Sequence, residues 1–224
     1  MLLSSDSHGV FPIWDAATRF FHWNLIFLIG FLWWSAETER FDLHEFSGIY
    51  LLSLLIWRIF LGFFGSESSK FKNFLVSPKT IRSYLRGVHT HNAGHNPLGG
   101  WMIVIMLFVL MIQGISGLFN TDDIFFYGPL YYMSSDNLRG IMGEVHNVTF
   151  CWILLLVSTH VVAVLWHQIF KQTFLIQAMI KGKAVGQISS AKPVGQMRLF
   201  VILFLIYIIF LCTVSLVPQA PSIF

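Results

Sequence analysis

The sequence predicts an all-α membrane protein: a four-helix transmembrane bundle with a fifth, C-terminal transmembrane helix and no soluble domain. Of its 224 residues, 55% are hydrophobic and only 11% are charged, and the mean hydropathy is +0.68. These values lie outside the range of soluble globular domains. Five apolar runs are also long enough to cross a hydrocarbon core of ~30 Å.

The five runs are separated by polar segments that contain Gly, Pro, Ser or charged residues. The first run lacks a basic leader and carries Trp33 and Trp34, so we expect a membrane helix rather than a cleaved signal peptide. The fifth run contains no histidine and no charge, which indicates lipid anchoring or contact with another subunit. The runs cover roughly 18–36, 44–64, 98–119, 143–168 and 199–217. The expected division is a bundle domain at 12–182, a cytoplasmic linker at 183–197, and the additional helix with a short tail at 198–224.

Lysine and arginine are unevenly distributed over the polar segments. Segments 65–97 and 169–198 each contain five, whereas segments 37–43 and 120–142 contain only Arg40 and Arg139. The positive-inside rule therefore places the basic segments and the N-terminus in the cytoplasm and the C-terminus outside. Because topology accounts for the pI of about 9.0, no nucleic-acid binding is expected. The outer loops are acidic and contain Glu37, Glu39, Asp42, Asp122, Asp123 and Asp136.

Two histidines in the fourth run are the most informative feature of the chain. His146 and His160 are fourteen residues apart, which on a helix brings them to within ~40° of one face and separates them by ~21 Å along the axis. That separation is too long for two ligands of one metal ion, whose bonds are ~2 Å. It suits two haems stacked across a membrane, each taking one axial ligand from this helix.

The predicted topology supplies the matching ligands on other helices. The first run enters from the cytoplasm and places His22 near the inner face, while the second enters from outside and places His44 near the outer face. The fourth run also enters from outside, so His146 pairs with His44 and His160 pairs with His22. We expect two bis-histidine b haems, bound non-covalently because the sequence has no Cys-x-x-Cys-His motif. Such six-coordinate haems transfer electrons and do not bind substrate.

Histidine inside a membrane also has roles that involve no haem. It serves as a hydrogen-bonding group between helices, and it occurs in proton relays and transporters. Relays normally combine histidine with acidic residues, and none of the five runs has Asp or Glu at its centre. Cys151 and Cys212 lie inside apolar runs and are interpreted as small packing residues.

Several further residues are candidates for haem contact. Arg58, fourteen residues after His44, either meets a haem propionate or extends to the cytoplasmic interface. Gly48, one turn after His44, either lets a porphyrin approach the backbone or allows close helix packing, and Gly114 and Gly117 have the same two interpretations.

Three polar or aromatic segments also have open interpretations. His95 and Asn96 either form the entry turn of the third helix or contact the inner haem or a quinone headgroup. His167, near the cytoplasmic surface, is expected to be an interface or propionate contact rather than a ligand. The aromatic segment 125–132 forms an interfacial belt or a docking face.

Five short motifs point to a known family when they are taken together. They are Arg19-Phe-Phe-His22-Trp23, His44-x-x-x-Gly48, Arg58-Ile-Phe-Leu-Gly62-Phe-Phe-Gly65, Gly94-His95-Asn96-Pro97-Leu98-Gly99, and His146 with His160. Over residues 12–182 this set resembles the bacterial and archaeal di-haem cytochrome b561 family, which includes the cytochrome b subunits of membrane-bound nickel-iron hydrogenases. The resemblance carries the family's four haem ligands onto the four histidines that topology selects. The fifth run departs from the family pattern.

The resemblance implies an electron-transfer subunit of the bacterial inner membrane with no catalytic residues of its own. A periplasmic partner, either a hydrogenase or a c-type cytochrome, would exchange electrons with the outer haem, and the inner haem with membrane quinone. A self-contained, quinone-linked oxidoreductase acting on a small substrate such as superoxide is an alternative, and a non-redox transporter or anchor is a third class. The Gly-His-Asn-Pro element resembles partner-linked members of the family and favours the first interpretation.

Overall fold

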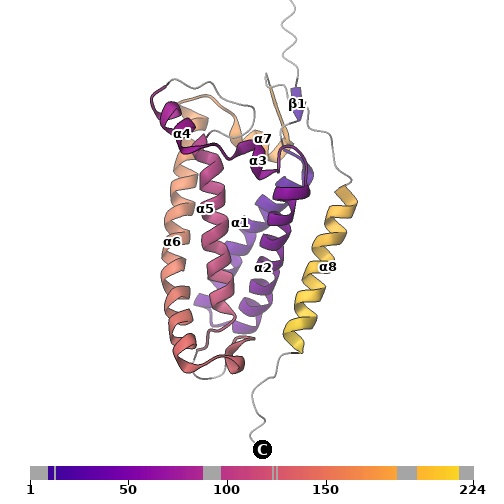
Figure 1. Cartoon of the computed structure of the whole chain (residues 1–224), viewed down its shortest axis with the longest axis vertical. Helices are drawn as coiled ribbons and strands as arrows, with labels where there is room; N and C mark the ends of the chain where they lie inside the picture. Colours follow the sequence, from indigo (N-terminus) through magenta and orange to yellow (C-terminus); the bar gives the residue numbers. More distant parts are fainter. Residues whose placement is uncertain are drawn as a thin grey trace, which may run out of the picture.

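Five long helices form the framework of the computed structural model, which describes residues 10–12, 14–87, 97–122, 124, 126–185 and 196–216. The long helices run roughly along one axis (Figure 1) and are α1 (Ala16–Glu37), α2 (Phe41–Phe64), α5 (Pro97–Gly117), α6 (Asp136–Ile169) and α8 (Gln196–Ser215). The connections contain the short helices α3 (Phe71–Phe74), α4 (Pro78–Leu85) and α7 (Leu175–Lys181) and a 3-10 turn at Tyr131–Met133. Strand β1 (Val10–Pro12) pairs antiparallel with β2 (Lys183–Val185). The chain is therefore mostly helical, as the sequence predicted.

Three of the long helices satisfy the requirements for a membrane span. Among the described residues, α2, α5 and α6 are long and apolar enough to cross a membrane. The apolar part of α8 is shorter, and α1 has 22 residues but does not meet the same criterion of length and hydropathy. Five crossings were expected from the sequence, and the crossing of the membrane by α1 and α8 stays a prediction.

Helix α6 begins at Asp136, well before the apolar run that predicted it. The hydroxyl of Ser135 accepts a hydrogen bond from the backbone amide of Leu138 and caps the first turn. Asp136 in that turn interacts favourably with the helix dipole and pairs with Arg139 at 2.9 Å. With 34 residues the helix is about 51 Å long, so its first turns extend beyond the apolar part.

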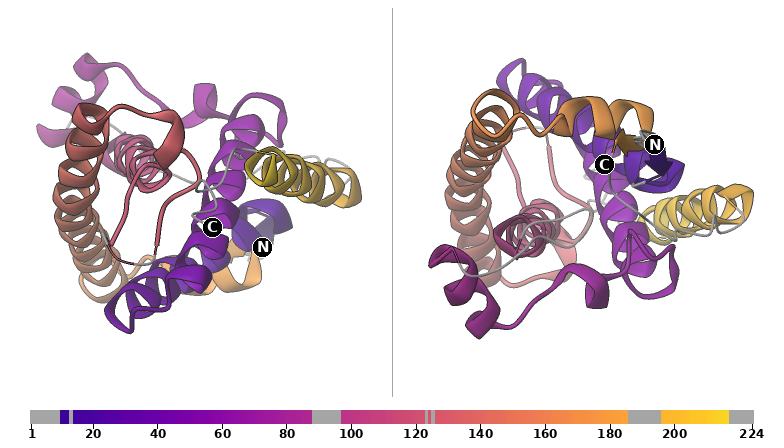
Figure 2. Two further views of the ribbon diagram at one scale, coloured as in Figure 1. Left: turned by 90° about the horizontal axis from the view of Figure 1, so that it is seen from below. Right: turned by 90° about the horizontal axis from the view of Figure 1, so that it is seen from above.

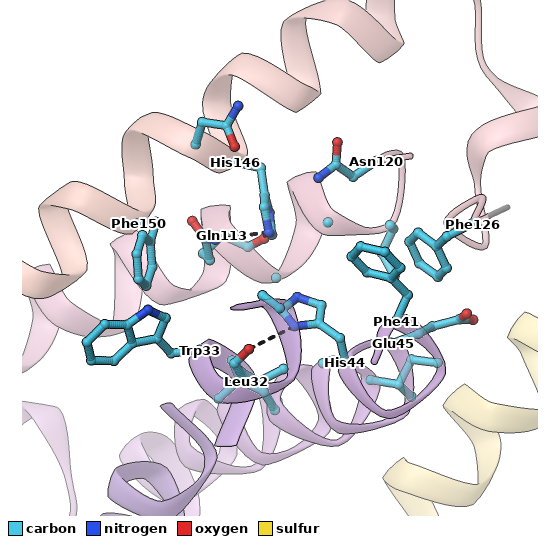
Figure 3. A pocket seen from close by; sticks show the side chains of 18 of the residues that line it. Leu32, Trp33, Phe41, His44, Glu45, Gln113, Asn120, Phe126, His146 and Phe150 are labelled. Atoms are coloured by element: carbon cyan, nitrogen blue, oxygen red, sulfur yellow. Dashed lines mark hydrogen bonds between the residues drawn. The ribbon is translucent and has the colours of Figure 1, made fainter. Parts of the chain in front are cut away.

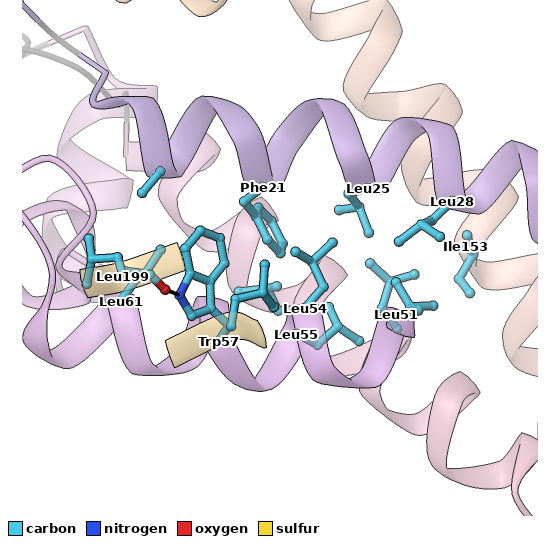
Figure 4. Packing of buried hydrophobic residues seen from close by; sticks show 14 residues of the cluster. Phe21, Leu25, Leu28, Leu51, Leu54, Leu55, Trp57, Leu61, Ile153 and Leu199 are labelled. Carbon is cyan, nitrogen blue, oxygen red and sulfur yellow. Dashed lines mark hydrogen bonds between the residues drawn. The ribbon is translucent and has the colours of Figure 1, made fainter. Parts of the chain in front are cut away.

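Helix α2 is the centre of the hydrophobic core. Seen from the two ends, α1, α2, α5 and α6 are arranged around a common interior, and α8 lies outside them against α2 (Figure 2). Four α2 side chains, Leu54, Leu55, Trp57 and Leu61, are completely buried. Figure 4 shows them packed beneath a row of α1 side chains, with Ile153 of α6 at one end of the cluster.

Helix α8 packs on its own chain. The indole Nε1 of Trp57 donates a hydrogen bond of 2.8 Å to the backbone carbonyl of Leu199. Around this bond lie ring contacts of Phe200 with Phe20 and Trp57, and of Tyr207 with Phe46 and Tyr50. The sequence suggested that the fifth helix contacts lipid or another subunit. In the structure this helix also packs against α2.

Candidate haem-binding sites

The four histidines meet in two pairs, one toward each end of the bundle. His44, in the first turn of α2, faces His146 in the first third of α6, and their ring centroids are 6.3 Å apart. His22, in the second turn of α1, faces His160 in the last third of α6 at 6.4 Å. We call these the His44–His146 level and the His22–His160 level. They are the two pairs that the topology argument predicted from the sequence.

The spacing of both pairs fits a six-coordinate iron. A metal–imidazole bond is about 2 Å and the ring centre lies about 1.1 Å beyond the nitrogen, so two imidazoles on opposite sides of one ion have centroids about 6.2 Å apart. The observed distances of 6.3 and 6.4 Å match this value. In the described part of the chain, no cluster of three or more His, Cys, Asp or Glu could hold a metal ion. Each level therefore offers two imidazoles, which suits a haem.

A cavity of about 340 Å³ adjoins the His44–His146 level. Figure 3 shows both rings directed into it, with Phe41, Phe126 and Phe150 among the aromatic walls. Gly48 lines this cavity, and a Cβ atom built there would meet nothing within 4 Å. A Cβ at Gly117 would lie only 3.0 Å from Cε1 of His146. The two glycines thus leave room beside the ligands.

The ring of His44 is held through its Nδ1 atom. This atom lies 3.0 Å from the backbone carbonyl oxygen of Leu32 and 3.2 Å from the hydroxyl of Ser35, both on α1. The hydroxyl of Ser35 donates to the same carbonyl at 3.0 Å, and Ser35 is completely buried. Because a carbonyl only accepts, Nδ1 carries the proton, which leaves the Nε2 lone pair for a metal.

The ring of His146 is held in the same way on α5. Its Nδ1 lies 3.0 Å from the carbonyl oxygen of Gln113 and 3.2 Å from the hydroxyl of Ser116, which itself donates to that carbonyl at 3.0 Å. The side-chain amide of Gln113 lies 3.1 Å from Nε2 of His146, and its oxygen accepts from the hydroxyl of Thr149. A metal at this atom would need the Nε2 lone pair, so the Gln113 amide would have to turn away for a haem to be held there.

The His22–His160 level has unsatisfied polar atoms instead. The Nδ1 atom of His22 is buried without a hydrogen-bond partner among the described residues, and the ring of His160 lies 6.4 Å away, centroid to centroid. Buried atoms of Thr18, Arg19 and Gln168, from the adjoining ends of α1 and α6, also lack partners. Because unsatisfied buried polar atoms are costly, a polar or metal-containing ligand at this end would stabilise the fold.

A family model described as prokaryotic cytochrome b561 matches residues 13–182, which is more than half of the chain. The chain belongs to this family. Searches of curated proteins and of solved structures gave no match. The family comprises membrane proteins that bind b-type haem and transfer electrons across the membrane. The match ends before α8, in agreement with the departure noted in the sequence.

Arg58 lies in an environment that the sequence did not predict. Its side chain is buried, Nη1 donates to the carbonyl of Ser69 at 3.2 Å, and the guanidinium lies 5.8 and 5.1 Å from the ring centroids of Phe21 and Phe71. These contacts join the end of α2 to the segment before α3 and stabilise the buried cation. A haem propionate contact of Arg58 stays a prediction.

Some of the remaining candidate residues lie outside the part of the chain that the structure describes, and the others can be placed. His95, Asn96, Asp123 and Phe125 lie outside the described residues. Phe126 stacks on Phe41 with centroids 5.5 Å apart and lines the cavity, so part of the aromatic segment forms a wall of the site. His167 accepts from Thr173 at its backbone carbonyl. Cys151 and Cys212 are exposed on the helix surfaces, in contrast to the buried positions expected.

Sequence reasoning missed the residues that hold the ligands, although one signal for them was available. Gln113 and Ser116 are the polar residues near the end of an otherwise apolar run, and Ser35 lies at the end of the first run. A polar side chain in an apolar helix requires a partner. The nearest partners at that depth are the two histidines.

Proposed function

We propose that the chain carries electrons across the bacterial cytoplasmic membrane through two b haems, one at each histidine level. The observation that supports this most directly is the pair of centroid distances, 6.3 and 6.4 Å, at two depths of one bundle. When bound, haem supplies reversible one-electron chemistry. The chain's own residues would hold each haem through two imidazole nitrogens, fix the ring orientations and exclude water with apolar walls.

The His44–His146 level lies on the periplasmic side in this proposal. The short helices at the opposite end of the molecule accompany the basic segments 65–97 and 169–198 (Figure 1), which the positive-inside rule assigns to the cytoplasm. The N-terminus is then cytoplasmic and the C-terminus periplasmic. The domain limits expected from the sequence, 12–182, 183–197 and 198–224, belong to the same proposal.

Each end of the bundle has side chains that suit a different redox partner. A periplasmic hydrogenase or c-type cytochrome exchanges electrons at the His44–His146 level, where the cavity is bordered by Glu37, Glu45 and Asp122. Membrane quinone reacts at the other level, where the unsatisfied atoms of Thr18, Arg19 and Gln168 suit a polar headgroup. Copurification of a redox subunit supports this assignment, whereas direct turnover of a small oxidant such as superoxide by the isolated chain would favour the self-contained alternative.

Haem content and ligand assignment test the proposal. A pyridine haemochrome assay should give two b haems per chain. His44→Ala or His146→Ala should remove one low-spin spectral component, and His22→Ala or His160→Ala the other, because each pair shares one iron. His167→Ala is the control and should keep both. One haem per chain, or loss of the same component in His22→Ala and His44→Ala, would contradict the assignment.

A further inference from the structure

We propose that Ser35 and Ser116 are positioning residues for the haem of the His44–His146 level and hold its midpoint potential below that of the other haem. The inference rests on the proposed function, because it requires one haem at each level. It concerns groups that touch the ligands and not the iron.

The two serines occupy equivalent places. Each is buried, Ser35 at 0% and Ser116 at 1% exposure, and each lies near the C-terminal end of the helix that precedes the ligand helix. Each donates to the carbonyl three residues earlier at 3.0 Å and lies 3.2 Å from a histidine Nδ1. We call the carbonyl and the serine hydroxyl that together face one histidine Nδ1 a clamp. Helices α1 and α5 each provide one clamp, on opposite sides of one site.

The clamp has a definite electronic effect. In each case the Nδ1–H group of the histidine faces two acceptors, a carbonyl oxygen at 3.0 Å and a hydroxyl oxygen at 3.2 Å. Donation from Nδ1–H fixes the tautomer and the ring orientation and makes Nε2 a stronger electron donor to the metal. A stronger donor stabilises ferric iron over ferrous iron, so the midpoint potential falls.

The other level lacks such clamps within the described part of the chain. Nδ1 of His22 is buried without a partner, and the ring of His160 faces that of His22 at a centroid distance of 6.4 Å. The imidazoles there would be the weaker donors, so a haem held at that level would have the higher potential. Electron transfer from the His44–His146 level to the His22–His160 level would then be favourable.

Ser53 provides the matched control. It is also completely buried, and its hydroxyl donates to the carbonyl of Ile49 at 2.9 Å, but among the described residues no hydrogen bond joins it to a histidine. Ser53→Ala therefore removes a helix hydroxyl without touching a ligand. A purely structural effect of removing a buried serine would appear in this variant as well.

The test is a potentiometric titration of the purified, haem-loaded protein. In the wild type, the component lost in His44→Ala should be the lower-potential one. Ser35→Ala and Ser116→Ala should each raise the midpoint potential of that component, because one of the two acceptors of a histidine Nδ1–H group is removed. The double variant should raise it further. The higher-potential component should stay unchanged. Ser35→Thr and Ser116→Thr should restore the wild-type value, and Ser53→Ala should leave both potentials in place.

A second readout separates positioning from stability. The g-values of the ferric low-spin signal report ligand orientation and should change for the shifted component only. Selective loss of that haem in Ser35→Ala or Ser116→Ala, with the other haem retained, also supports the clamp. Unchanged or lowered potentials in both variants, or the reverse order of potentials in the wild type, would overturn the inference. If the ligand variants fail to deplete one component per pair, the proposed function itself fails.

Discussion

Gly48 illustrates how a missing side chain contributes to a site. It lies one turn after His44 on α2 and lines the cavity, and no atom lies within 4 Å of the position of its absent Cβ. Its freedom from packing distinguishes it from Gly114, where a Cβ would collide with Leu52. Close helix packing, one of the two interpretations from the sequence, therefore describes Gly114, while Gly48 borders open space.

Replacing Gly48 by leucine should displace the haem of the His44–His146 level. The leucine side chain would extend into a cavity of about 340 Å³ between the two ligands. Absorption spectra should show loss of that component and retention of the other. Gly30→Leu is the control, because Gly30 is exposed on α1 and its Cβ also meets nothing within 4 Å. Full haem content in Gly48→Leu would show that the porphyrin does not use this space.

Single residues also show where sequence reasoning stops. The four histidines could be predicted because helix periodicity and the distribution of Lys and Arg determine their face and depth. The clamps could not, because the partner of His44 is a carbonyl on α1 and the partner of His146 is a carbonyl on α5. Such contacts depend on which helices are neighbours and on how each helix is rotated. The contacts of Arg58 could not be predicted for the same reason, since Phe71 and Ser69 approach it only after the chain turns back at the end of α2.

At the scale of elements, the apolar runs predicted where the long helices lie but not where they end. Helix α6 gained two turns from the cap at Ser135, and the short helices α3, α4 and α7 formed in segments interpreted from the sequence only as polar connections. Local capping determines these features, as at Ser77, whose side chain accepts from the amide of Thr80. Strand pairing of β1 with β2 joins residues more than 170 positions apart and has no local signal in the sequence.

The packing of α8 against α2 gives a prediction at the scale of elements. Phe200→Ala removes ring contacts with Phe20 at 5.0 Å and Trp57 at 6.0 Å and should lower the free energy of unfolding by ~1–3 kcal/mol. Both haem components should persist, because α8 lies on the side of α2 away from α5 and α6 (Figure 2). Phe204→Ala is the control, since Phe204 is 62% exposed and should change stability little. Denaturation followed by haem absorbance and by intrinsic fluorescence measures both effects.

Across the whole molecule, charge is divided between the two ends. The acidic residues at the His44 end also have local roles: Asp122 accepts from the backbone amides of Ile124 and Phe126, and Asp136 pairs with Arg139. The predicted topology alone would account for an acidic outer surface, so these contacts do not by themselves indicate a docking site. Glu37 and Glu39 are exposed and suit a test, and the one side-chain hydrogen bond of Glu37 to a described residue is a long one of 3.3 Å from the Trp33 indole.

If a basic patch of the redox partner docks on this end, electron transfer between the partner and the cytochrome should slow by several-fold as the salt concentration rises. The reason is that exposed charges are screened over ~8 to 10 Å near physiological ionic strength. The double variant Glu37→Gln, Glu39→Gln should react more slowly than the wild type at low salt. Glu67→Gln, which removes one negative charge at the opposite end beside Lys70, should leave the rate unchanged. Stopped-flow absorbance of the haem measures all three. A rate indifferent to salt and to the Glu37 and Glu39 changes would leave the acids as a consequence of topology and move the docking face to the aromatic segment 125–132, where Tyr127, Tyr131 and Tyr132 form a cluster.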